Sequence, residues 1–225
     1  AATPYGATEA LPVTYVSSKE IFSSPEAAAK TGEQGTLVGK AVAGVEVRII
    51  KLADAALDAG EMEELPLRHV GEVIVRGPNV SREYLRREEE TRQAKIIDGK
   101  SFWHRMGDMG YLDERGNLYF CGRKTHMVRT EKRVYYSVPT ERLFNNHPRV
   151  RRSALVSLAD GSAGIVVEPY AGCFPHEERQ RQLLRRVFDV EHHRSPVPRL
   201  FRYATSASMS CGFNWLANEG MIPGG

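Results

Sequence analysis

The sequence has few of the residues that would build a disulfide scaffold or a membrane anchor. Its 225 residues include only three cysteines, Cys121, Cys173 and Cys211, which lie far apart. An odd number without metal-ligand spacing favours a reducing, cytoplasmic compartment over a disulfide framework. No apolar run reaches the roughly 18 residues of a membrane-spanning helix, and no charged-then-apolar signal segment opens the chain.

Lysine is missing from the last part of the chain. None follows Lys132, while arginines continue in the runs 149–152 and 179–186. The formal net charge is only +3, which does not require a polyanionic partner. Because no aromatic residues alternate with these arginines to stack bases, a solvated helix face and a strand entrance explain them better than nucleic-acid binding does.

Short stretches of alternating apolar and polar residues, bounded by glycine-rich turns, dominate the first half of the chain. They predict an antiparallel sheet or a partial barrel with strands at 45–50, 72–77, 107–112 and 117–123. The acidic, alanine-rich stretch 52–65 predicts a loop or a short helix. At the start of the chain, Pro4, Tyr5 and Gly6 predict a turn.

The second half predicts a smaller α-β-β-α unit, with helices at 139–148 and 175–193 and strands at 150–158 and 163–170. The remaining stretch has little periodicity. The predicted fold class is therefore α/β, of the α+β type. We expect a β-rich part of a large domain over residues 1–123, a small α+β domain over 124–194 and an irregular tail over 195–225.

Four local patterns in fixed order carry a more specific signal. They are YGATE at 5–9, GEVIVRGPNVSREYL at 71–85, WHRMGDMGYLDERGNLYFCGRK at 103–124, and the Gly-Arg pair at the junction of the two halves. Together they resemble the adenylate-forming (AMP-binding) superfamily of acyl- and aryl-CoA ligases, luciferases and peptide-synthetase adenylation domains. The resemblance extends to about residue 194. It implies the C-terminal part of an adenylation domain and an ATP- and Mg²⁺-dependent, AMP-forming activation of a carboxylate through an acyl-adenylate.

The resemblance also implies roles for residues of the first motif. Glu9 resembles the family's Mg²⁺ ligand, and a cation bound to phosphates needs only one or two carboxylates. Thr8 resembles the donor to the α-phosphate, although a turn-stabilising hydroxyl is the plainer interpretation of a threonine here. Tyr5 and Gly6 are expected at the nucleotide, with Tyr5 beside the adenine face. Ordinary core packing is the alternative for Tyr5.

Two further nucleotide-binding residues are expected in the third motif. Asp108 resembles the aspartate that accepts both ribose hydroxyls, and a carboxylate with two acceptor oxygens suits a vicinal diol. A turn aspartate between glycines is the alternative. Arg123 resembles the arginine that reaches the ribose or a phosphate. Lys124 and Thr125 are expected in the hinge, with Lys124 exposed to solvent, while Trp103 and His104 are interpreted as packing residues.

Within the superfamily, YGATEALPV and GRKTHMVRT are similar to the β-lactone synthetases of olefin biosynthesis. Those enzymes adenylate a long-chain β-hydroxy acid, whose own hydroxyl then expels AMP, and other enzymes of an olefin-forming pathway are expected partners. Thr125 at the hinge and the glycine-free loop 129–141 depart from ordinary CoA ligases. A long-chain fatty-acid–CoA ligase and a non-catalytic nucleotide-binding fragment remain the alternatives.

Two expected elements of the superfamily are missing from this chain. The family's Ser/Thr/Gly-rich phosphate loop normally precedes YGATE, and its catalytic lysine normally lies near the C-terminus. We therefore expect the chain to be the C-terminal part of a longer enzyme and to be nearly inactive alone. A shift of reading frame is a possible origin of the lysine-free tail.

Overall fold

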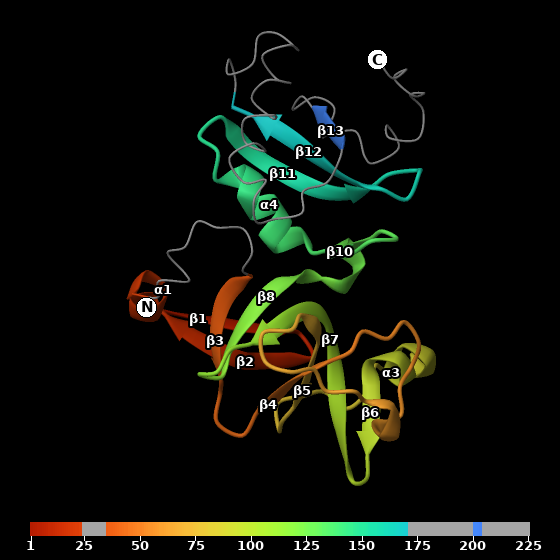
Figure 1. Ribbon diagram of the computed structural model, residues 1–225. Helices are drawn as coiled ribbons and strands as arrows, with labels where there is room; N and C mark the ends of the chain where they lie inside the picture. Colours follow the sequence, from red (N-terminus) through yellow and green to blue (C-terminus); the bar gives the residue numbers. More distant parts are fainter. Residues whose placement is uncertain (24–34, 171–199, 204–225) are drawn as a thin grey trace. The chain divides into compact units, whose positions relative to one another are not determined.

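The computed structural model describes residues 1–23, 35–170 and 200–203 (Figure 1). Its strands are β1 Ala2–Ala7, β2 Ala10–Ser17, β3 Thr36–Ala41, β4 Glu46–Ile50, β5 Gly71–Arg76, β6 Lys95–Asp98, β7 Ser101–Leu112, β8 Asn117–Arg123, β9 Val128–Arg129, β10 Val134–Tyr135, β11 Val150–Ser157, β12 Ala163–Pro169 and β13 Leu200–Tyr203. The helices are α1 Ser18–Ser23, α3 Glu88–Ala94 and α4 Ser137–Asn145, with 3-10 turns η1 Ala59–Glu61 and η2 Lys124–His126.

The chain divides into two compact units, which we describe separately. The first consists of Ala1–Met127 and Val134–Thr140, and the second of Val128–Arg133 together with the chain from Glu141 onward. The domain boundary expected after residue 123 stays a prediction. Strands predominate over helices in the described residues, as the sequence-based α+β class requires.

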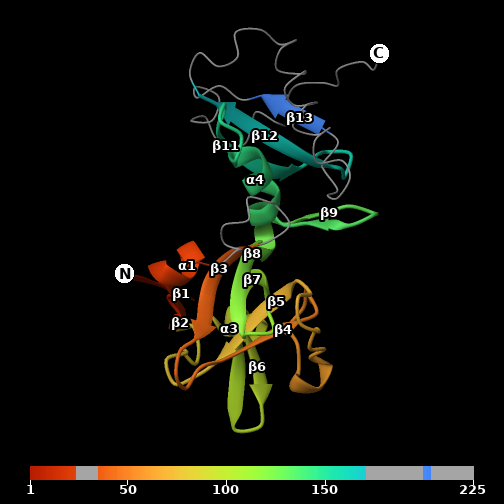
Figure 2. The same ribbon diagram turned by 60° about the vertical axis from the view of Figure 1, so that its left-hand side comes forward.

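The first unit is built on one antiparallel sheet. Its strands follow the order β1-β2-β3-β8-β7-β5-β4, and β6 pairs with β7 outside this path. The predicted strands at 45–50, 72–77 and 117–123 are confirmed as β4, β5 and β8. The one expected at 107–112 is the second half of a longer strand, β7, which turns back from β6 at the tip of the hairpin seen in Figure 2.

Strand β5 lies in the middle of the core, with apolar side chains packed on both of its faces. Val73 and Val75 belong to one buried cluster, while Ile74 packs with Trp103 in another. Successive side chains of β5 point to opposite faces of the sheet, and both of these faces are buried. Trp103 is fully buried, in agreement with its expected packing role.

The start of the chain differs from the sequence-based expectation. Pro4, Tyr5 and Gly6 do not form a turn but lie within β1, because this segment pairs with β2. The register of that pair shifts at Gly6, where an added Cβ would stand 2.4 Å from the carbonyl oxygen of Ala10. The turn itself is made by Thr8 and Glu9. Pairing along the whole strand thus overrides the local turn preference of the Pro-Tyr-Gly sequence.

The second unit contains β11 and β12 as an antiparallel pair, with β13 parallel to β12. These two strands confirm the prediction for 150–158 and 163–170, and α4 confirms a helix near 139–148. The Glu168 carboxylate forms ion pairs with Arg151 and Arg152, whose side chains are more than half exposed. The predicted helix at 175–193 and most of the tail lie outside the described residues. Among the described helices, none has the length and apolar character needed to cross a membrane.

Candidate functional site

Three of the residues singled out in the sequence meet in space. The Tyr5 hydroxyl donates to Oδ2 of Asp108 at 2.6 Å, and Nη1 of Arg123 donates to Oδ1 of Asp108 at 2.9 Å. The same guanidinium nitrogen lies 3.1 Å from the carbonyl oxygen of Met106. Asp108 and Arg123 are directly paired in the register of β7 and β8. We call Tyr5, Asp108 and Arg123 the aspartate cluster.

A bulge in β7 places Asp108 in this cluster. Glu72 on β5 pairs with Met109, whereas Ile74 pairs with Arg105, so β7 has extra residues over this interval. Gly107 lies inside the bulge with φ of +67°, a left-handed conformation that glycine adopts without steric cost. Bulges re-aim side chains and are frequent beside functional sites. Gly107 thus allows the backbone conformation that points the side chain of Asp108 into the cluster.

The aspartate cluster keeps capacity for a ligand. Asp108 is buried, while the Arg123 side chain is 51% exposed, so one side of the ion pair faces solvent. Burial, and then the negative charge of Asp108, raise the pKa of Tyr5, so the phenol stays protonated and acts as a donor. A carboxylate can accept about four hydrogen bonds, and Tyr5 and Arg123 account for two of them. The two remaining acceptor positions of the carboxylate match the two hydroxyls of a diol.

Glu9 lies at the β1–β2 turn and has a different partner. The hydroxyl of Tyr84 donates to Oε1 of Glu9 at 2.8 Å. This hydrogen bond is the main reason that the pKa of Glu9 is lowered, and the charge of Lys95 makes a smaller contribution in the same direction. Thr8 beside it is exposed. The turn therefore presents an ionised carboxylate and a hydroxyl next to each other.

The donor set at this turn fits Mg²⁺ bound to a polyphosphate. Such a cation keeps several waters and takes one or two carboxylates together with phosphate oxygens, and Glu9 supplies one ionised carboxylate. No group of three or more His, Cys, Asp or Glu side chains that could hold a metal ion occurs in the described parts of the chain.

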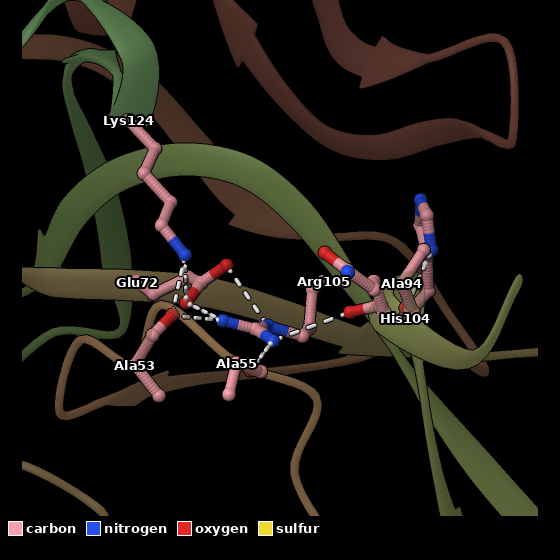
Figure 3. Close-up of polar contacts among 8 residues, drawn as sticks. Ala53, Ala55, Glu72, Ala94, His104, Arg105 and Lys124 are labelled. Carbon is pink, nitrogen blue, oxygen red and sulfur yellow. Dashed lines mark hydrogen bonds and ion pairs between the residues drawn. The ribbon is translucent and has the colours of Figure 1, made fainter. Parts of the chain in front are cut away.

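A buried ion pair joins β5 to β7, the strand that also carries Asp108 (Figure 3). Nη2 of Arg105 on β7 stands 2.7 Å from Oε2 of Glu72 on β5, and both side chains are at least 95% buried. The guanidinium also donates to the carbonyl oxygens of Ala53, Ala55 and Gln93. Arg105 therefore ties the loop after β4 and the end of α3 to the central strands.

Lys124 joins this network, contrary to the expectation that it is exposed. Its ammonium lies 3.5 Å from Oε2 of Glu72 and donates to the carbonyl oxygen of Ala53, and its side chain is only 21% exposed (Figure 3). The Glu72 carboxylate, already paired with Arg105, and the carbonyl oxygen of Ala53 together give the Lys124 ammonium two acceptors, which explains the difference. Thr125, the other expected hinge residue, is exposed in the short turn η2. The hinge role of both residues stays a prediction.

A second buried cation was not anticipated from the sequence. Nζ of Lys95 on β6 donates to the carbonyl oxygen of Ser81 at 2.6 Å and lies 3.1 Å from Nδ1 of His104 on β7. Burial lowers the pKa of Lys95 to about 8. Burial, and then the charge of Lys95, lower the pKa of His104 to about 4, so the imidazole is neutral at pH 7.

A cavity of about 620 Å³ adjoins Tyr84 and Lys95 and is also lined by Asp58, Glu83, Arg86 and Thr91, among others. Its lining does not include the aspartate cluster. Tyr84 was missed as a site residue although it lies within the quoted stretch 71–85, where an aromatic hydroxyl was the available signal. Lys95, Glu72 and Arg105 had no such signal, since their roles depend on strand pairing.

Comparison with known proteins relates this chain to nucleotide-dependent enzymes. Residues 2–85 match the family described as AMP-binding enzyme. A protein named olefin beta-lactone synthetase from Xanthomonas campestris pv. campestris is 45% identical over 214 residues, which are 90% of this chain and 38% of that protein. The protein of the same name from Stenotrophomonas maltophilia is 44% identical over 73% of this chain and 30% of its own length. The chain thus spans well under half of these relatives.

Solved structures support the same fold. The amide bond synthetase McbA from Marinactinospora thermotolerans superposes with a TM-score of 0.68 at 28% identity, covering 90% of this chain and 37% of that one. The O-succinylbenzoate Coenzyme A synthetase from Bacillus subtilis, in complex with ATP and magnesium ion, has a TM-score of 0.67 at 20% identity, with coverages of 90% and 37%. The expected fold, that of part of an adenylate-forming enzyme, is therefore confirmed.

The buried pair of Glu72 and Arg105 generates a prediction about stability. Glu72→Gln removes the charge that compensates Arg105, and breaking a buried ion pair costs about 3 kcal/mol or more. We expect a loss of that size in urea unfolding. Glu114→Gln is the matched control, because it breaks the solvent-exposed pair with Arg68 and should change stability little. Equal losses in the two variants would contradict the assigned role of the buried network.

The depressed pKa of His104 predicts a pH dependence. The unfolded imidazole takes up a proton near its ordinary pKa of 6.5, but the folded one does so only near 4. Stability is therefore lost as the pH falls from 6.5 to 4, by up to about 3 kcal/mol. His104→Gln should lose less over this range in urea unfolding, and the exposed His126→Gln should behave like the wild type. A His104→Gln profile parallel to the wild type would refute the shift.

Proposed function

We propose that this chain, which belongs to the AMP-binding enzyme family, forms the ribose- and phosphate-binding part of an ATP-dependent, AMP-forming enzyme that activates a carboxylate. The aspartate cluster is the observation that carries the proposal. It holds a buried carboxylate with acceptor capacity left over, beside a half-exposed guanidinium. A nucleoside monophosphate offers the matching groups, namely a diol and an anion.

Each site residue then has one task. Asp108 accepts the ribose hydroxyls, and Tyr5 orients that carboxylate through its hydrogen bond while flanking the adenine. Arg123 contacts the ribose or a phosphate through the exposed part of its guanidinium. Thr8 donates to the α-phosphate, and Glu9 holds Mg²⁺. The cation, when bound, supplies charge neutralisation for the phosphates.

The reaction joins two anions, so positioning and charge neutralisation are its main requirements. A carboxylate oxygen attacks the α-phosphorus of ATP, the bond to the β-phosphate oxygen breaks, and pyrophosphate leaves with an acyl-adenylate remaining. We further propose that the acid is a long-chain β-hydroxy acid, whose hydroxyl oxygen attacks the acyl carbon and displaces AMP to close a β-lactone. Similarity to the two olefin beta-lactone synthetases supports this choice.

A long-chain fatty-acid–CoA ligase is the alternative, and similarity to a CoA ligase of another acid supports the thioester-forming part of it. A 2-succinylbenzoate--CoA ligase from Bacillus cytotoxicus is 35% identical over 45% of this chain and 20% of its own length. The lower identity, Thr125 at the hinge and the glycine-free loop 129–141 favour the lactone. A lactone needs no rotation that admits an external thiol.

The nucleotide assignment predicts the effect of Asp108→Asn on AMP binding. The variant keeps one acceptor oxygen but loses the charge, and a hydrogen bond to a charged group contributes roughly 1.5–3 kcal/mol. We expect AMP affinity to fall about tenfold to hundredfold in isothermal titration calorimetry, without added Mg²⁺.

Asp160→Asn provides the control, because Asp160 is an exposed turn aspartate of the second unit whose carboxylate, within the described part of the chain, accepts hydrogen bonds from Ser162 in its own turn. It should leave AMP affinity unchanged. Equal affinity of AMP for the wild type and Asp108→Asn would remove the ribose assignment, and no AMP binding by the wild type would remove the proposed function.

The choice between lactone and thioester predicts a product. A protein extended to the full length of its relatives, given ATP, Mg²⁺ and a long-chain β-hydroxy acid, should release AMP and form a β-lactone whether or not CoA is present. Mass spectrometry distinguishes the products. A plain fatty acid without the β-hydroxyl is the control and should stop at the adenylate. Formation of acyl-CoA with no lactone would establish the ligase alternative.

A further inference from the structure

Lys95 is a buried cation with a defined set of neighbours. It pairs with His104 across β6 and β7, and its side chain is almost fully buried. Its ammonium donates to the carbonyl oxygen of Ser81 and lies within hydrogen-bond distance of Nδ1 of His104. The rings of Tyr84 and Phe102 face the ammonium with centroids 5.9 and 5.4 Å away. The ammonium therefore has a carbonyl oxygen, an imidazole nitrogen and two aromatic rings as neighbours.

The imidazole of His104 contacts two neighbours through the same atom. Nδ1 of His104 lies 3.1 Å from Nζ of Lys95 and 3.2 Å from the carbonyl oxygen of Ala94 (Figure 3). An ammonium can only donate and a carbonyl oxygen can only accept, so the role of Nδ1 depends on the tautomer of the ring. In either tautomer the imidazole lies against the end of the Lys95 side chain.

The carbonyl that Lys95 binds belongs to the segment that holds Glu9. Val80 forms an isolated β-bridge with Ala10, and the amide of Ser81 donates to the backbone carbonyl of Glu9 at 2.8 Å. Tyr84, at the end of the same segment, donates to the Glu9 carboxylate. Residues 80–84 thus contact Glu9 through both its backbone and its side chain, and Lys95 binds the carbonyl oxygen of Ser81 in the same segment.

We propose that Lys95 is a positioning residue for the Glu9 carboxylate, and that through residues 80–84 it sets the affinity of the nucleotide site for Mg²⁺. The inference rests on the proposed function, in which Glu9 is the Mg²⁺ ligand. Lys95 does not contact the carboxylate itself. It fixes Ser81, and Ser81 together with Tyr84 fixes where Glu9 points.

The use of a lysine here needs a physical reason. A buried ammonium is unfavourable unless it is partnered, and an apolar side chain of similar length would fill the space without that cost. What an apolar side chain cannot do is bind the Ser81 carbonyl. The charge of Lys95 also makes a small contribution to the lowered pKa of Glu9, whose largest cause is the hydrogen bond from Tyr84. The hydrogen bond to the Ser81 carbonyl therefore explains why a lysine occupies this position.

The test compares AMP and ATP binding in Lys95→Met. Calorimetry gives the affinity for AMP without Mg²⁺, for ATP without Mg²⁺, and for ATP over a Mg²⁺ titration. We expect both metal-free affinities to stay within about twofold of the wild type. The Mg²⁺ concentration that gives half of the full gain in ATP affinity should rise about tenfold. Glu9→Gln should shift the same quantity in the same direction.

Two variants serve as controls. Lys100→Met removes an exposed lysine from the turn of the same β6–β7 hairpin and should match the wild type. Lys95→Arg keeps a charged donor and should restore part of the Mg²⁺ response. If Lys95→Met does not fold, as judged by circular dichroism, His104→Leu takes its place, because it removes the imidazole that contacts the ammonium.

The outcomes separate the inference from the function it rests on. An unchanged Mg²⁺ requirement in folded Lys95→Met, or in folded His104→Leu, overturns the positioning role. An equal loss of metal-free ATP affinity overturns it too, because Lys95 would then bind phosphate directly. If the wild type binds no AMP, or Glu9→Gln leaves the Mg²⁺ requirement unchanged, the proposed function itself fails.

Discussion

The buried ion pair between Glu72 and Arg105 is the constraint on which the first unit depends. A carboxylate and a guanidinium in the core must face each other, since either one alone would be a buried uncompensated charge. This requirement aligns β5 with β7. The remaining donors of Arg105 then bind carbonyl groups of the loop after β4 and of α3. The loop after β4 and the end of α3 are thereby fixed relative to the strands that carry the candidate site.

Glu72 also extends this constraint to the end of β8. Lys124 directly follows Arg123, and its ammonium lies near the Glu72 carboxylate (Figure 3). The chain is therefore anchored immediately after the arginine of the aspartate cluster. A rotation of the backbone at Lys124 and Thr125 that moves the Lys124 side chain away from Glu72 would break this contact. Lys124 is better understood as an anchor of the strand end than as a freely exposed residue.

Sequence patterns predicted the strands because alternation with period two is a local property. They did so for β4, β5 and β8, whose bounds agree with the predicted ranges within a residue. The turn expected at Pro4, Tyr5 and Gly6 was wrong because pairing with β2 is not local. Turn preferences contribute little energy compared with a full row of inter-strand hydrogen bonds.

The candidate site was predictable only in part, for the same reason. Tyr5, Asp108 and Arg123 were found as members of motifs, and the structure brings them into contact. Lys95 and His104 are nine residues apart in the chain and meet only through the register of the β6–β7 hairpin. A lysine in a charged stretch gives no sign that it will be buried.

One strand, β7, carries a member of three polar clusters in the first unit. His104 partners Lys95, Arg105 partners Glu72, and Asp108 partners Tyr5 and Arg123. The first two interactions fix the strand on either side of its long axis, just before the bulge at Gly107. A bulge is a weak point in a ladder, so its geometry is reproducible only if the strand is held firmly beside it. The buried charges, costly for stability, are thus placed where they fix the part of β7 that carries Asp108.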